Sequence, residues 1–209
     1  MALPATHLRF AVDLAGGFSI RSRPQYLSGT LYPDSRCLTG VDRRSSHSRA
    51  CSRSDFVTDD FTLGWYLHCR CDLIQTDLFT EQVPGLADLN EIDRWIQLSA
   101  LKMLQDREDM REFDLDGALA QLTHAPSVFG EDPQHVRAYL DLVRKTYGGR
   151  KRLDMQDYHE LWIGVRLDPE LAAAIIAEAR RQADDANLID RLRSIYPLSI
   201  DRFNVDARR

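Results

Sequence analysis

The spacing of apolar residues constrains this chain more than any other feature, because it follows the period of an α-helix. From Asp168 to about Tyr196, apolar residues recur every three or four positions behind an Asp-Pro-Glu triplet that is typical of a helix start. No alternating apolar run bounded by turn residues indicates a strand. The pattern predicts an all-α fold, a multi-helix bundle in which residues 1–209 form a single domain.

Seven other segments carry the same periodicity and are predicted helices. They are Pro4–Gly16, a short one from Pro24 to Pro33, Phe61–Phe79 with a cap at Thr58 or Asp59, Leu89–Asp106, Leu115–Leu122, Pro133–Tyr147 and Met155–Ile163. Thr39–Ser54 is rich in Ser, Arg and Gly and is predicted to be a loop. The domain divides into a metal-ligand half (1–83), a helical remainder (84–196) and a peripheral tail (197–209).

Composition and charge exclude several classes of protein. Hydrophobic residues make up 44% and charged residues 28%, which is ordinary for a globular protein. No apolar run has the length of a membrane span and no secretory signal is recognisable, so a cytoplasmic protein is expected. The net charge of -5 gives no strong nucleic-acid signal. The four cysteines form no CxxC pair and are expected to be reduced, partly buried thiols. Nothing indicates an oligomeric state.

One segment departs from the acidic average. Between Arg21 and Arg53 there are seven arginines and two aspartates. A local basic loop attracts anions even on an acidic protein, although a solvated arginine-rich loop is the simpler interpretation. Arg43, Arg44 and Arg49 are the predicted contacts for a small anionic substrate that contains phosphate.

His68 and Asp72 are spaced so that one turn of helix separates an imidazole from a carboxylate on the same face. Divalent ions bind convergent nitrogen and oxygen donors of this type. The surrounding sequence is apolar and aromatic, so both side chains are expected to be at least partly buried and to need partners. A simple hydrogen bond between the two is the alternative.

Three residues upstream complete a candidate metal site. His7 lies in the first predicted helix, Asp34 follows Pro33 at a helix end, and His47 lies in the polar loop. Each also has an ordinary interpretation, as a packing residue, a turn residue and an exposed loop residue. Together with His68 and Asp72 they supply the donors that a transition metal needs.

The order of these motifs resembles the zinc-dependent phospholipase C family and its bacterial relatives of unassigned role. The matching stretches are Thr6-His7, Leu31-Tyr32-Pro33-Asp34, Ser46-His47-Ser48 and the segment Phe61–Asp72, which contains Gly-x-x-x-His-x-x-x-Asp. The resemblance covers the first third of the chain, from His7 to about Phe79. Single-strand nucleases are related to this family.

The resemblance implies an all-helical fold with metal ions in a cleft between helices, and hydrolysis of phosphate esters or diesters. By carry-over, Asp34, His47 and His68 would hold one ion, His7 would help to hold a second, and Asp72 would lie between them. Asp34 or Asp72 is the expected catalytic group that orients or deprotonates water.

Departures from the family limit the number of ions. The chain has no tryptophan at its N-terminus, no histidine from Gln75 to Gln82, and no later His-x-x-x-Glu pair. One or two divalent ions, zinc first, are therefore expected rather than three. The HD phosphohydrolases are a weaker alternative, because the adjacent His-Asp dyad is absent. The rival function is a non-catalytic metal-binding protein or a binding module with a degraded site.

Overall fold

A computed structural model describes residues 3–206, which form α-helices and short 3-10 turns without any strand. The predicted all-α fold is confirmed. The helices are α1 (Pro4–Leu14), α2 (Arg23–Leu31), α3 (Arg36–Thr39), α4 (Arg43–Ser46), α5 (Asp60–Gln82), α6 (Glu91–Asp109), α7 (Leu115–Ala120), α8 (Pro133–Tyr147), α9 (Met155–Gly164), α10 (Pro169–Gln182) and α11 (Ala186–Asp206). None of these helices is both long and apolar enough to cross a membrane.

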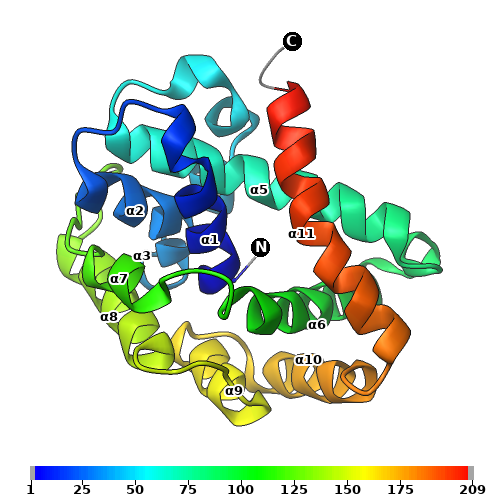
Figure 1. The fold of residues 1–209 in the computed structure, drawn as a ribbon. Helices are drawn as coiled ribbons and strands as arrows, with labels where there is room; N and C mark the ends of the chain where they lie inside the picture. Colours follow the sequence, from blue (N-terminus) through cyan, green and yellow to red (C-terminus); the bar gives the residue numbers. More distant parts are fainter. Residues whose placement is uncertain (1–2, 207–209) are drawn as a thin grey trace.

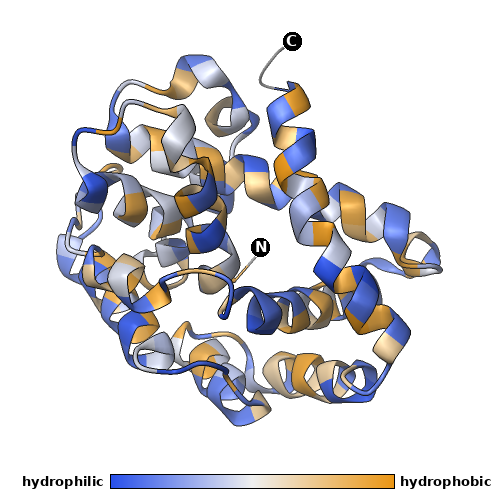
Figure 2. Cartoon of the chain, viewed as in Figure 1, coloured by the Kyte–Doolittle hydropathy of each residue, from blue (hydrophilic) through white to orange (hydrophobic). Residues whose placement is uncertain are grey.

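The longest helix, α5, is the axis around which the elements that carry the predicted metal ligands gather (Figure 1). Its start is set by a capping box, in which the Asp59 side chain accepts the Thr62 amide and the Thr62 hydroxyl bonds the Asp59 backbone. Helix α2 packs along α5 more extensively than any other pair of helices, and α11 crosses both α5 and α6. Apolar and polar residues share the surface of each helix, as amphipathic helices require (Figure 2).

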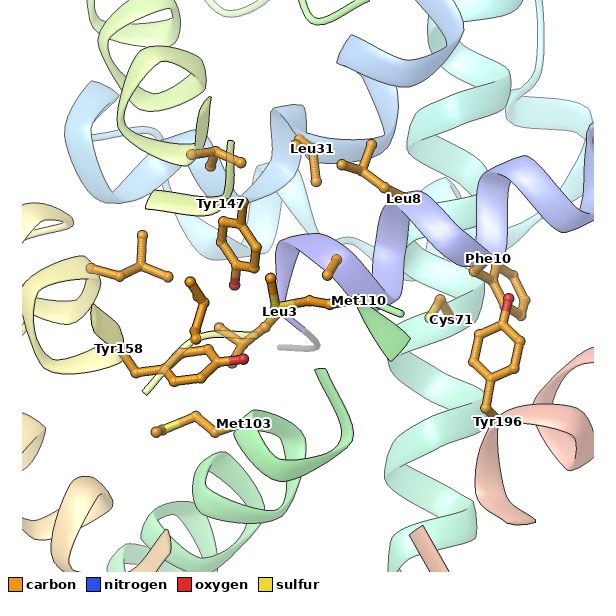
Figure 3. Packing of buried hydrophobic residues seen from close by; sticks show 14 of the residues in the cluster. Leu3, Leu8, Phe10, Leu31, Cys71, Met103, Met110, Tyr147, Tyr158 and Tyr196 are labelled. Carbon is orange, nitrogen blue, oxygen red and sulfur yellow. The ribbon is translucent and has the colours of Figure 1, made fainter. Parts of the chain in front are cut away.

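One apolar cluster runs through the molecule from Leu3 to Phe203. Figure 3 shows part of it, where Tyr147 and Tyr158 reach in from α8 and from α9 beside Met103 of α6. The cluster takes residues from both ends of the chain, so α1 and α11 each complete it.

Three predictions about the elements are wrong. The expected loop at 39–54 contains helix α4, capped by Asp42, and a 3-10 turn over Arg49–Ser52, capped by Ser48. The expected long helix from Asp168 is two helices, because Asp185 accepts the Leu188 amide and starts a new one.

The tail after Pro197 is not peripheral over residues 197–206. Helix α11 continues through Pro197 beyond the predicted end at about Tyr196, and it buries Ser199 and Phe203. Burial of these side chains outweighs the loss of one backbone hydrogen bond at proline.

Two glycines bring α2 and α5 into backbone contact. A Cβ atom built on Gly64 would lie 1.9 Å from the Tyr26 carbonyl oxygen, and one built on Gly29 would lie 2.1 Å from the Phe61 carbonyl oxygen. Any larger residue would collide with backbone, which cannot rotate away as a side chain can. The two helices therefore lie closer than side chains at these positions would allow.

We expect Gly64→Ala to destabilise the protein although alanine normally favours a helix by about 1 kcal/mol. Relief of the clash needs a shift of α2 against α5, which should cost about 3 kcal/mol. Urea denaturation measures the change. Gly16→Ala is the control, because no heavy atom lies within 4 Å of its added Cβ. Equal stability of the two variants would contradict the close packing.

Candidate metal centre

One face of α5 contributes four side chains to the site. Trp65, His68, Cys69 and Asp72 follow one another at helical spacing and are turned towards the segment 43–52. His68 is fully buried and Asp72 keeps 8% of its surface exposed. The predicted pairing of His68 with Asp72 on one helix face is therefore present.

The close approach of α2 orients His68. Its Nδ1 lies 2.8 Å from the Thr30 carbonyl oxygen. A carbonyl can only accept, so Nδ1 carries the proton and donates, and the lone pair of neutral His68 is on Nε2. Burial lowers the pKa of His68, although Asp34 and Asp72 act in the opposite direction. A neutral imidazole with a fixed lone pair is the form that binds metal.

Two contacts of the neighbouring residue Ser46 position His47 against this face of α5. The Trp65 indole donates from Nε1 to the Ser46 carbonyl oxygen over 2.7 Å, and the Ser46 hydroxyl lies 2.9 Å from His47 Nδ1. The His47 Nε2 atom lies 3.1 Å from His68 Nε2. The two imidazoles thus turn their Nε2 atoms towards a common point.

Asp34 enters from the 3-10 turn Tyr32–Ser35, which follows α2. Its Oδ1 lies 3.4 Å from His47 Nε2 and 3.8 Å from His68 Nε2, and this buried oxygen makes no hydrogen bond. Burial alone would raise the pKa of Asp34, but the facing His68 and His47 hold it below its usual value. A buried, ionised, unsatisfied carboxylate oxygen that faces two imidazoles is suited to a cation.

Asp72 faces both sides of the site. Its Oδ2 lies 3.8 Å from His47 Nε2 and 3.9 Å from His68 Nε2, while its Oδ1 lies 3.7 Å from His7 Nε2 and 3.9 Å from Lys102 Nζ. Burial acts to raise the pKa of the Asp72 carboxyl, but cations that include Lys102 hold it well below its usual value. Asp72 is therefore an anion that links the two sets of donors.

His7 lies against His68, with the rings stacked at a centroid distance of 3.8 Å. It is buried, and neither ring nitrogen makes a hydrogen bond within the described residues 3–206. Burial lowers the pKa of His7 well below its usual value, and nearby His68 lowers it further. A buried neutral imidazole without a hydrogen-bond partner is costly unless a ligand takes its lone pair.

The donor spacing fits a metal ion. Two groups of three have their ligand atoms within 4.8 Å of one another: His7, His68 and Asp72, and Asp34, His47 and His68. A tetrahedral ion with ligands at about 2.0–2.1 Å separates them by roughly 3.3–3.4 Å. The separations of His47 Nε2 and His68 Nε2 from each other and from the carboxylate oxygens of Asp34 and Asp72 run from 3.1 to 3.9 Å. Together with the unsatisfied atoms, this spacing shows that the residues suit such an ion.

Two of the three predicted phosphate-binding arginines lie at this site. A cavity of about 220 Å³ is lined by Arg43 and Arg49 together with His47 and Asp72. Arg44 is exposed and does not line this cavity. Its neighbour Arg43 projects into the cavity from the same single turn of helix, which cannot present adjacent residues to one side.

Two contributors were not identified from the sequence. The Thr30 carbonyl leaves no trace in a side-chain pattern. Lys102 belongs to a polar stripe on α6 with Gln105, Asp106 and Asp109, and such a stripe is typical of a solvent-facing side. In the structure all four are buried. Lys102 donates to the Thr76 hydroxyl over 3.3 Å besides facing Asp72.

Asp106 and Asp109 form a second buried polar cluster, next to α1. Asp106 accepts the Thr6 amide and the hydroxyls of Tyr147 and Tyr158 at 2.8 to 3.0 Å. Asp109 accepts from Thr6, Arg9 and Gln105. Burial raises the pKa of Asp106 to about 7 and that of Asp109 to about 6, despite these hydrogen bonds.

We expect Asp106 to weaken the fold as the pH rises through neutrality. Its folded-state pKa of about 7 lies above that of an unfolded aspartate, about 3.9. The folded chain therefore binds this proton more tightly, and the resulting stability is lost as pH rises towards 7. Asp106→Asn should remove about 3 kcal/mol of this dependence between pH 5 and pH 8.

Urea denaturation of both proteins at the two pH values measures the effect. The free energy of unfolding of the variant, relative to the unaltered protein, should be higher at pH 8 than at pH 5. Asp141→Asn, at an exposed position on α8, serves as the control. Parallel pH profiles for the Asp106 variant and the unaltered protein would show that this carboxyl does not titrate as described.

Comparison with protein-family models, with curated proteins and with solved structures gives no match. The geometry of the site and the order of its residues along the chain are therefore the basis for assigning a function.

Proposed function

We propose that this protein is a metal-dependent hydrolase that acts on a phosphate ester or diester. The observation that carries the proposal is the convergence of two carboxylates and three imidazoles from four elements, with Asp34 Oδ1 and both nitrogens of His7 buried and unsatisfied. The order of the same residues along the chain resembles the zinc-dependent phospholipase C family, which supports the same chemistry.

Asp34, His47 and His68 would hold one divalent ion, for which zinc is the first choice because nitrogen and oxygen donors dominate. His7 and Asp72 would help to hold a second ion, or Asp72 would remain beside a single one. Such an ion supplies Lewis acidity, which activates water and polarises a phosphoryl oxygen.

Other groups of the chain would act on the substrate directly. Asp72 borders the cavity of about 220 Å³, and Asp34 or Asp72 would orient or deprotonate an attacking water. Arg43 and Arg49 line the same cavity and would bind phosphate oxygens through paired hydrogen bonds. Neither arginine forms an ion pair with a carboxylate among residues 3–206, so both are available for an anion.

The test compares metal-loaded and chelated protein on a panel of phosphomonoesters and phosphodiesters. We expect turnover that chelation removes and that zinc restores. Turnover in the presence of chelator would contradict the metal dependence. If metal-loaded protein hydrolyses nothing in the panel, the alternative of a non-catalytic metal-binding protein becomes the better one. A metal ion whose coordination positions are all filled by side chains would also favour the non-catalytic alternative.

A further inference from the structure

A second cavity, of about 490 Å³, adjoins the candidate metal centre. It is lined by four cationic side chains from four separate parts of the fold: Arg36 of α3, Arg43 of α4, Lys102 of α6, and Arg166 in the turn between α9 and α10. No aspartate or glutamate lines it. The positive charge of these side chains is therefore not neutralised by any carboxylate in the lining of the cavity.

The three arginines of this cavity lack carboxylate partners. Among residues 3–206, eight arginines form ion pairs with carboxylates, whereas Arg36, Arg43 and Arg166 form none. The Nε atom of Arg36 is buried without a hydrogen-bond partner. A buried guanidinium N–H that meets no acceptor in the protein is suited to one supplied by a ligand.

Arg166 occupies a position that favours glycine. Its φ of 62° lies in the left-handed region, and it is the only residue other than glycine among 3–206 with a positive φ. The amides of Arg166 and Leu167 bond the Ile163 and Trp162 carbonyls, the arrangement that ends many helices with glycine. Gly40, Gly85, Gly130 and Gly149 fill the other such positions. The side chain of Arg166 is thus retained at a conformational cost.

The two cavities meet beside the candidate metal centre. Arg43 and Thr76 line both of them, and Lys102 lies in the second cavity while its Nζ faces Asp72 of the first. A molecule whose phosphate lies beside Asp72 would therefore extend past Lys102 towards Arg36 and Arg166. Trp95 and Trp162 form an apolar wall on that side.

We infer that this second cavity binds a second phosphate group of the substrate, so that the substrate is an organic bisphosphate. Arg36, Arg43, Lys102 and Arg166 hold the phosphate that is not cleaved, through bidentate guanidinium contacts and the point charge of the ammonium. Trp95 and Trp162 contact the carbon skeleton between the two phosphates. This inference depends on the proposed function only for the cleavage of the other phosphate.

The first experiment measures binding of inorganic phosphate to metal-free protein by calorimetry, since chelation removes the contribution of the metal ion to phosphate binding in the first cavity. We expect Arg166→Gly and Arg36→Gln each to weaken this binding about tenfold or more. Arg166→Gly should at the same time raise the melting temperature, because glycine adopts the left-handed conformation without strain. A loss of binding in a more stable protein cannot be attributed to misfolding.

Arg137→Gln is the matched control, an exposed arginine of α8 that lines neither cavity. Its affinity for phosphate should equal that of the unaltered protein. If phosphate does not bind metal-free protein, or binds it equally well after Arg166→Gly and Arg36→Gln, the inference is overturned.

The second experiment compares kcat/KM of metal-loaded protein for glucose 1,6-bisphosphate and glucose 1-phosphate. We expect the bisphosphate to be preferred about tenfold or more, and Arg166→Gly to remove the preference while hydrolysis of the monophosphate persists. Turnover without preference overturns the inference and leaves the proposed hydrolase standing. Arginine-dependent phosphate binding without any turnover supports the anion site and counts against the hydrolase.

Discussion

Replacement of His68 and Asp72 together by alanine is expected to abolish metal binding. The unaltered protein should carry roughly one to two equivalents of transition metal after purification without added ions. His68 belongs to both groups of donors, and Asp72 faces His7 on one side and the two other imidazoles on the other. Their loss leaves neither group with three donors, so the metal content should fall below about 0.1 equivalents.

Elemental analysis of the purified variant provides the measurement, and circular dichroism shows whether the helices remain. The matched control is His135→Ala with Asp141→Ala, an imidazole and a carboxylate that are both exposed on α8. This control should keep its full metal content. Unchanged metal in the His68 and Asp72 variant would mean that the ligands have been assigned wrongly.

Asp34→Asn should reduce hydrolysis about 10²- to 10⁴-fold while metal content changes far less. Asparagine keeps an oxygen at the position of Oδ1 but removes the negative charge and the basicity. That charge is stabilised in the folded protein, since His68 and His47 keep the pKa of Asp34 below its usual value despite burial. The amide would still serve as a ligand, but it would neither accept a proton nor orient water as a carboxylate does.

Rates per bound metal ion separate the two effects. Asp141→Asn on α8 is the control and should leave both rate and metal content unchanged. An unaltered rate per bound ion would show that Asp34 acts only as a ligand and takes no part in the catalytic step.

Part of the site was predictable, because two of its residues belong to one helix. His68 and Asp72 are one turn apart on α5, so their common face follows from the sequence. The positions of His7, Asp34 and His47 came from the resemblance, and the structure brings all three to that face. The sequence does not reveal why glycine occupies position 64. The structure gives the reason, because a Cβ atom there would collide with the Tyr26 carbonyl oxygen.

The remainder could not be predicted, because periodicity does not distinguish a polar stripe in water from one inside the protein. Lys102, Asp106 and Asp109 repeat on α6 as solvent-facing residues do, yet their partners come from α1, α5, α8 and α9. Proline often ends a helix, but α11 continues through Pro197 because the residues beyond it, such as Phe203, are buried in the core. Arg166 adopts the left-handed backbone conformation, which the neighbouring sequence does not predict.

The backbone contact between α2 and α5 also limits how this chain can vary. The atoms nearest to an added Cβ at positions 29 and 64 belong to Phe61, Tyr26 and Thr30, none of which is a predicted ligand, yet each position has room for a hydrogen atom only. In a library of random substitutions selected for retained metal, both positions should tolerate no residue except glycine, as strictly as the ligands themselves. The arginines of the two cavities have no such packing role and should change freely when substrate is not selected for. Descendants of this chain could therefore acquire new substrates on an unchanged pair of helices.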